Sequence, residues 1–377
     1  MIPNAYIGKE HTLLKHLILK DYLEGWSHKM ASISKYVGKL SLFYVDCFSG
    51  PWKSSSEEHS DTSIYIALRA LNEAHKTWIK NGYNIEMNAI FVEKNKKSFD
   101  ELESLVDIEK QNVNVFTFLG EFGNYVQHIQ SIVNDNPLLL FVDPTGWKGA
   151  SMKFIAPLVN SRFRDVIINV MFDHINRFKD AELKFIRQQM EDFFEETLKP
   201  DLSEEELLSL YRKNIKNKCR LNYSADLIIP HPTKYRTKYR LVVGGNHPEV
   251  IKLFRDIEYK VTGNIASVMR AEIKDREKFE NTGQFKMELG DAKDHTPYEE
   301  ARLFGLQRTK RDIRKILMKY GKISFEKIWP ILLERNHITF NDSKNLIKEM
   351  LEDDLIIQNM SKSERSIKDY HILELKK

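Results

Sequence analysis

The chain has 377 residues, of which 42% are hydrophobic and 30% charged, and its formal net charge is +4. This length favours two or three domains over a single core. No apolar run reaches the ~20 residues of a membrane-spanning helix, and the N-terminus lacks an export pattern. The two cysteines, Cys47 and Cys219, argue against a disulfide framework or a thiolate zinc site, so we expect a cytoplasmic protein.

The first 280 residues alternate between helical and strand patterns. Apolar residues recur at helical spacing over residues 10–29. Short apolar strands then alternate with further helical segments; these strands are LSLFYVD, NAIFVE, VNVFTFL, LLLFVD and DVIINVMF. Such alternation predicts parallel βαβ units. We therefore predict an α/β domain over residues 1–280, with a Rossmann-like sheet and a helical insertion at about 180–220.

Acidic residues stand at or just after the ends of four predicted strands; they are Asp46, Glu93, Glu121 and Asp143. Ligands of open α/β sheets bind beyond the carboxyl ends of the strands, so these positions predict a binding crevice. After the first strand, Gly50 lets the backbone approach a ligand closely. Each position taken alone also fits an ordinary strand-end turn or a surface carboxylate.

The residue types suggest individual roles in that crevice. Asp46 can cap its turn or hold a charged amino group. Glu93 is placed to accept two ribose hydroxyls, by the same logic as the acidic residue of dinucleotide-binding folds. Glu121 can accept from an adenine amino group while Phe122 packs against the ring.

The segment from Asp143 to Trp147 is the sharpest local feature. Asp143 and the carbonyl of the Pro144 turn can accept hydrogen bonds from an exocyclic amine, and Trp147 can stack on a flat base. The alternative is a strand-end turn with a core tryptophan. Farther along, Asn176 is a candidate for a base edge and Arg177 for a phosphate, or both belong to a helix N-terminus. His174 has no metal partner at useful spacing, so we predict no metal site.

The C-terminal region has its own pattern. After a linker at 281–308, three short helical patterns and the hairpin segments LIIQN and YHILEL predict a winged helix-turn-helix domain over residues 309–377. Residues 308–377 contain 16 Lys and Arg against 11 Asp and Glu. The third helix would present Lys344, Asn345 and Lys348 to phosphates or base edges of nucleic acid, with DNA expected. The alternative is a winged helix that binds protein.

The order strand–Asp–Gly, strand–Glu, Gly–Glu and Asp–Pro–aromatic resembles the class I S-adenosylmethionine-dependent methyltransferases. Residues 10 to about 275 are similar to the three-Cys-motif partner protein family, through the segments YVDCFSGP, FVEKN, FVDPTGW, IINVMFDHINRF and GGNHPEVIKLFRDI.

The resemblance implies a methyltransferase-like fold that binds S-adenosylmethionine. The implied cofactor-binding residues are Asp46, Phe48, Gly50, Glu93 and Glu121. The implied catalytic residues are Asp143, Pro144 and Trp147. It also implies a partner with three cysteines, similar to radical-enzyme iron–sulfur proteins, in a nucleic-acid modification, repair or phage-defence pathway.

Two departures from the family pattern bear on activity. Trp52 follows Pro51 where the family usually has a second glycine, and Thr145 and Gly146 separate Pro144 from the aromatic residue. Two hypotheses therefore stand. The first is a methyltransferase acting on nucleic acid; the second is a catalytically degenerate, cofactor-binding scaffold or DNA-binding partner of a three-cysteine protein. A nicotinamide enzyme is disfavoured because GxGxxG is missing after the first strand.

Overall fold

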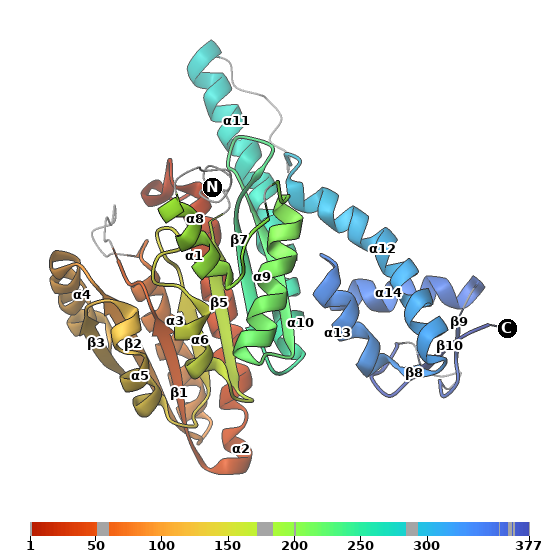
Figure 1. The fold of residues 1–377 in the computed structure, drawn as a ribbon, viewed down its shortest axis with the longest axis horizontal. Helices are drawn as coiled ribbons and strands as arrows, with labels where there is room; N and C mark the ends of the chain where they lie inside the picture. The colour runs from red at the N-terminus through yellow and green to blue at the C-terminus, as the bar shows by residue number, and fades with distance from the viewer. Residues whose placement is uncertain are drawn as a thin grey trace. The chain divides into compact units, whose positions relative to one another are not determined.

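The computed structural model describes residues 2–50, 60–171, 184–199, 201–283, 293–353, 355–360, 364 and 366–376. The chain forms two compact units (Figure 1). Unit 1 comprises Met1–Pro232 and Thr237–Val250, and unit 2 comprises Thr233–Arg236 and Ile251–Lys377. The division therefore falls after Val250, not near residue 280 as the sequence predicted.

Unit 1 is built on a seven-stranded sheet with the order β3-β2-β1-β4-β5-β7-β6 (Figure 1). Strands β1 to β5 pair in parallel, and β7 is antiparallel to both β5 and β6. The bounds are β1 Lys39–Asp46, β2 Asn84–Glu93, β3 Val113–Leu119, β4 Leu138–Val142, β5 Arg164–Val170, β6 Tyr223–Pro230 and β7 Thr237–Gly245. This sheet confirms the predicted α/β class and is consistent with a Rossmann-like methyltransferase fold.

Helices cover both faces of the sheet because its parallel strands are apolar on both sides. The bounds are α1 Glu10–Ala31, α2 Ser34–Val37, α3 Ser63–Lys80, α4 Lys96–Glu109, α5 Val126–Val133, α6 Met152–Val159, α8 Lys184–Phe194 and α9 Glu204–Cys219. Helices α1 and α3 contact each other, and α6 contacts α9. Phe193, Phe194 and Tyr211 bring α8 and α9, the predicted insertion, into the sheet's hydrophobic core.

Unit 2 contains the π-helix η3 and a small three-stranded antiparallel sheet with the order β8-β10-β9. The bounds are α10 Glu249–Glu258, η3 Tyr259–Ile265, α11 Ala266–Thr282, α12 Pro297–Tyr320, β8 Ile323–Ser324, α13 Phe325–Arg335, α14 Phe340–Asp353, β9 Leu355–Ile357 and β10 Ile372–Leu375. The predicted three helices and hairpin of the tail are thus present. However, α12 begins at Pro297, so residues 297–308 of the predicted linker are helical.

Contacts within unit 2 explain why its boundary lies before α11. Tyr298 of α12 is buried against η3, where a Cβ on Gly263 would come within 2.7 Å of its ring. Farther back, the Arg255 Nε of α10 donates to the carbonyl of Leu333 in α13 over 2.8 Å. The segment 251–282 therefore packs with the C-terminal helices.

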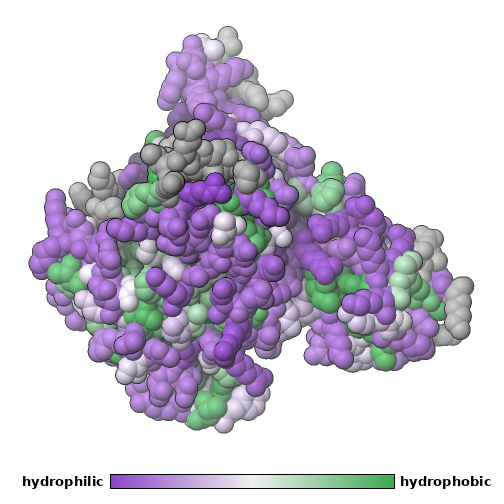
Figure 2. Space-filling view, viewed as in Figure 1, coloured by the Kyte–Doolittle hydropathy of each residue, from purple (hydrophilic) through white to green (hydrophobic). Residues whose placement is uncertain are grey.

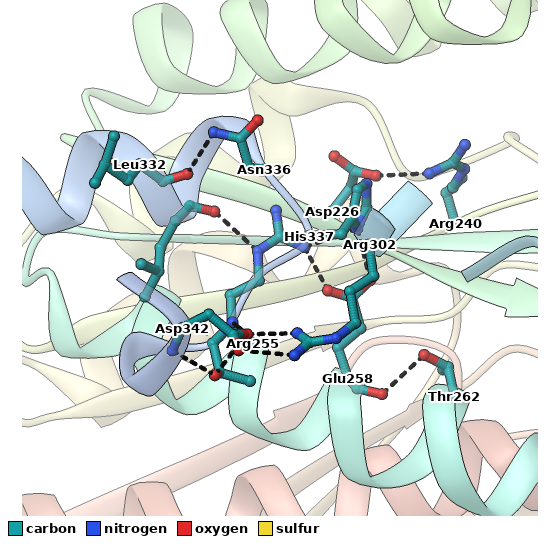
Figure 3. Close-up of polar contacts among 12 residues, drawn as sticks. Asp226, Arg240, Arg255, Glu258, Thr262, Arg302, Leu332, Asn336, His337 and Asp342 are labelled. Carbon is teal, nitrogen blue, oxygen red and sulfur yellow. Dashed lines mark hydrogen bonds and ion pairs between the residues drawn. The ribbon is translucent and has the colours of Figure 1, made fainter. Parts of the chain in front are cut away.

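A buried ionic network holds α10 in unit 2 (Figure 3). One carboxylate oxygen of Glu258 pairs with the Arg255 Nη1 at 2.6 Å, and the other pairs with the His337 Nδ1 at 2.8 Å. Burial alone raises the pKa of Glu258, but the charges of His337 and Arg255 outweigh that effect, so the net pKa is lowered. Nearby, Arg302 pairs with Asp342, which also accepts from the Thr339 amide at 2.7 Å.

One face of the molecule shows how its polar and apolar side chains are distributed. The face drawn in Figure 2 is mostly hydrophilic, with small separate hydrophobic areas, as is expected when large apolar side chains are buried. Within the described parts of the chain, no helix is both long and apolar enough to cross a membrane.

A buried carboxyl in unit 1 makes stability depend on pH. Asp165 of β5 is 5% exposed and accepts from the Tyr22 hydroxyl of α1 at 3.1 Å. Burial raises its pKa to about 7, against about 3.9 in an unfolded chain. Between these values the folded state binds the proton more tightly. The contribution of Asp165 to the free energy of unfolding is therefore largest below about pH 4, and it is lost as the pH rises through 7.

We predict that Asp165→Asn removes this contribution, because the amide keeps an acceptor for Tyr22 and does not ionise. Asp46, whose pKa burial also raises to about 7, adds a slope of the same sign, whereas His11 and His16, whose pKa values burial lowers to about 4 and about 3, add slopes of the opposite sign. The slope of the free energy of unfolding against pH should therefore be about 1 kcal/mol per pH unit more positive in Asp165→Asn than in the wild type between pH 5 and 7. Urea unfolding at pH 5, 6 and 7 measures it, with Asp107→Asn on exposed α4 as the control. An Asp165→Asn slope equal to that of the wild type would contradict the prediction.

Candidate functional site

Two cavities adjoin at the carboxyl ends of the parallel strands in unit 1. The larger has a volume of about 780 Å³, and its lining includes Glu93 after β2 and Glu121 after β3. The smaller has a volume of about 330 Å³, and its lining includes Asp143 and Pro144 after β4. Three residues, Phe48, Gly50 and Thr145, line both cavities. The ends of β1 to β4 therefore lead into two adjoining cavities, and binding of a ligand there stays a prediction.

Glu93 and Gly50 approach very closely at the floor of the larger cavity. Glu93 is 6% exposed, and its Oε1 accepts from the Asn95 amide at 2.5 Å. A Cβ on Gly50 would lie only 2.1 Å from the Glu93 Oε2. Any side chain at this position would therefore shift the Glu93 carboxylate.

Aromatic side chains form the walls of the larger cavity. Phe122 packs between Phe48, with ring centroids 6.1 Å apart, and Phe154, at 6.4 Å. Trp147 is 9% exposed, and its Nε1 donates to the Gln189 Oε1 of α8 at 3.3 Å. Flat apolar walls with a few carboxylates suit a planar heterocycle that carries hydroxyls and an amine.

The smaller cavity contains a polar cluster centred on Asp143. Its carboxylate forms an ion pair with Lys15 of α1 and accepts from the Asn169 Nδ2 of β5 at 2.7 Å. His16 lies beside them in the lining and its Nδ1 is 2.9 Å from the Tyr6 hydroxyl. Burial lowers the pKa of His16 to about 3, so its ring is neutral at physiological pH.

Asp46 has a supporting position. It is 1% exposed and is not among the described residues that line either cavity. Its carboxylate accepts from the Phe48 amide and the Ser63 hydroxyl, each at 3.1 Å. Asp46 therefore caps the turn that presents Phe48 and Gly50, which is the first of its two predicted roles.

Most of the predicted site residues of unit 1 line one or both cavities, whereas Asp46, predicted to bind the cofactor, lines neither. The larger contains Phe48, Gly50, Glu93 and Glu121, and it also contains Trp147. Asp143 and Pro144 line the smaller cavity, so the three predicted catalytic residues do not share one space. Asn176, Arg177 and Trp52 lie outside the described residues. No group of three His, Cys, Asp or Glu residues that could hold a metal occurs in the described ranges.

Sequence reasoning missed Lys15, Asn169 and Gln189. Asn169 lies next to the end of β5, so the rule that located the other strand ends could have found it. Lys15 reaches Asp143 across 128 positions of sequence, and the helical pattern of α1 gave no indication of that contact. On α14 in unit 2, Asn345 and Lys348 are exposed and Lys344 is half-buried.

Comparisons with known proteins leave the family open. No protein-family model matches the chain, and no curated protein matches it, so membership of the three-Cys-motif partner family stays a prediction. Among solved structures, similar ones include the O-methyltransferase TomG from Streptomyces achromogenes in complex with S-adenosylmethionine, at TM-score 0.32 and 10% identity, covering 59% of this chain and 79% of that one.

Two further structures are similarly distant. The O-methyltransferase from Bacillus cereus in complex with S-adenosylhomocysteine has TM-score 0.31 and 10% identity, covering 58% of this chain and 80% of that one. Loganic acid methyltransferase with S-adenosylhomocysteine has TM-score 0.31 and 8% identity, covering 72% and 88%. Likenesses this distant do not define a function.

If the larger cavity binds S-adenosylmethionine as the sequence predicts, Glu93→Gln should weaken binding of S-adenosylhomocysteine roughly 10- to 100-fold, because a hydrogen bond to a charged group is lost. Gly50→Ala should weaken it at least as much by displacing the same carboxylate. Calorimetric titration measures both, with Glu101→Gln on the exposed face of α4 as the matched control. Wild-type affinity in both site variants would rule out this cavity as the cofactor site.

Proposed function

We propose that this protein transfers a methyl group from S-adenosylmethionine to nucleic acid. The observation that carries the proposal is the pair of adjoining cavities at the strand ends. One has aromatic walls and a buried carboxylate, and the other contains Asp143 and Pro144. Volumes of this size are typical of small-molecule sites. Two spaces that meet at Phe48, Gly50 and Thr145 suit a reaction between two bound molecules.

The residues of the larger cavity fit the cofactor. Glu93 offers a buried carboxylate to the ribose hydroxyls, and the closeness of Gly50 keeps that carboxylate at the cavity floor. Glu121, exposed at the rim, can accept from the adenine amine while Phe48 and Phe122 contact the ring. Trp147 lines this cavity, so we assign it a contact with the cofactor and not stacking on the target base.

The smaller cavity is where we place the acceptor. S-adenosylmethionine supplies a methyl group that its sulfonium charge already activates, so the protein mainly has to align the reacting atoms. Asp143 and the Pro144 carbonyl would accept hydrogen bonds from the acceptor amine. Lys15 and Asn169 hold the Asp143 carboxylate in one orientation from two different elements, which is the preorganisation that such alignment needs.

The nucleic-acid part of the proposal rests on unit 2. Its three helices and the antiparallel pairing of β9 and β10 fit a winged helix-turn-helix, whose third helix enters the major groove of DNA. In that arrangement α14 would present Lys344, Asn345 and Lys348. The three-cysteine partner and the modification, repair or phage-defence pathway rest on the family resemblance alone.

One observation favours the second hypothesis, a scaffold without transferase activity. The ion pair with Lys15 partly neutralises Asp143, and a neutralised carboxylate is a weaker acceptor for an amine. A scaffold would still bind DNA, so cofactor binding and methyl transfer must be measured separately.

We predict that the protein incorporates labelled methyl groups from S-adenosylmethionine into nucleic acid, tested on both DNA and RNA. Asp143→Ala should lower the transfer rate roughly 100-fold or more, because the acceptor loses its aligning group. Its affinity for S-adenosylhomocysteine should stay within about threefold, because Asp143 lies in the other cavity. Asp107→Ala on α4 is the matched control. A folded, cofactor-saturated protein that labels neither polymer would contradict the proposal.

A further inference from the structure

Four lysines from three segments of unit 2 form one group of like charges, and two of them contact the same aromatic ring. They are Lys252 of α10, Lys344 and Lys348 of α14, and Lys368 just before β10; we call them the lysine cluster. The Nζ atoms of Lys252 and Lys344 each lie 4.4 Å from the centroid of the Phe340 ring. Burial lowers the pKa of Lys344, Asp369 opposes this, and the charges of Lys252, Lys368 and Lys348 add to the lowering. The charges of the other three lysines therefore all act on Lys344.

The fold fixes this arrangement. Lys252 stands three positions before Arg255 on α10, so it lies on the same side of the helix about one turn away. Arg255 in turn is held by Glu258 and by the Leu333 carbonyl. His337, between α13 and α14, completes the same buried network (Figure 3). Lys252 is thus anchored beside α14 by buried contacts and does not reach Phe340 through a free surface loop.

Such clustering of like charges is unfavourable unless an anion offsets it. Two further lysines of this unit have a carboxylate partner: Lys310 pairs with Glu349 at 2.7 Å and Lys322 with Glu374 at 3.4 Å. Within the described part of unit 2, neither Lys344, Lys348 nor Lys368 forms a salt bridge. Repulsion between like charges that the fold keeps close together is expected at a functional surface.

The side chains around the cluster indicate which anion fits. Lysine ammonium groups act as point charges toward phosphates, and the exposed Asn345 stands between Lys344 and Lys348 on α14, where it can meet a base edge. The major groove of B-form DNA admits a helix, whereas that of A-form RNA is too deep and narrow for side chains to read. An acidic peptide or an anionic bilayer would meet the same charge but would give Asn345 no role.

We propose that the lysine cluster is a phosphate clamp for duplex DNA, in which α14 lies in the major groove while Lys252 and Lys368 bind backbone phosphates beside it. The DNA contact surface then extends beyond the C-terminal helices and hairpin to include α10. This inference rests on the nucleic-acid part of the proposed function and not on methyl transfer.

The test measures the salt dependence of binding by the full chain. A fluorescent 20-base-pair DNA duplex of mixed sequence is titrated by anisotropy between 50 and 200 mM KCl. Each phosphate contact contributes about 0.9 to the slope of log K against log salt concentration. Lys252→Ala and Lys368→Ala should each weaken binding and reduce the slope by about 0.9, and the double variant by about 1.8.

The matched control is Lys315→Ala, which removes one exposed charge from α12 of the same unit. Its charge is not among those that act on Lys344, so its slope should equal that of the wild type. Circular dichroism checks that all variants are folded. An unchanged slope in the folded double variant, or an equal loss in Lys315→Ala, would overturn the clamp.

Competition separates the possible partners. Unlabelled duplex DNA should displace the probe at far lower concentration than polyglutamate, duplex RNA or vesicles containing phosphatidylserine. Equal competition by any of these three would overturn the assignment to duplex DNA. If the protein methylates DNA but the lysine variants keep the wild-type slope of log K against log salt concentration, only the clamp is contradicted. If the variants show the expected slopes but no methyl transfer is detected, only the enzymatic proposal is contradicted.

Discussion

The candidate site depends on one close approach, between the backbone of Gly50 after β1 and the carboxylate of Glu93 after β2. Neighbouring parallel strands end side by side at one edge of the sheet, which brings these two segments together. A side chain at Gly50 would move this carboxylate, because a Cβ would lie 2.1 Å from it. The turn after β1, which Asp46 caps, therefore lines both cavities and leaves the acidic group of β2 open to a ligand.

The sequence was informative wherever the relevant interaction is local or follows from the sheet. Strand ends after β1 to β4 were identifiable because apolar runs stop at acidic residues, and parallel pairing then places Glu93, Glu121 and Asp143 at one edge. The sequence does not specify which side of that edge a residue occupies. Trp147 follows Asp143 by four positions, yet it lines the larger cavity, where its indole donates to Gln189 of α8.

Long-range polar contacts were beyond sequence reasoning for a physical reason. Lys15 in α1 and Arg255 and Glu258 in α10 occur in helices rich in charge, where a charged side chain is usually solvated. Burial gives each a structural role: Lys15 pairs with Asp143, and Arg255 with Glu258 ties α10 to the C-terminal helices. The second contact explains why the boundary of unit 2 lies at residue 251, about thirty residues before the position that composition indicated.

We infer that the larger cavity binds the nucleoside of S-adenosylmethionine. A crystal structure of the protein grown with saturating S-adenosylhomocysteine tests it most directly. We expect nucleoside density in the larger cavity, with the ribose hydroxyls on Glu93 and the adenine between the aromatic walls near Glu121. Density for the nucleoside at another place, or side chains that fill this cavity at saturating ligand, would contradict it.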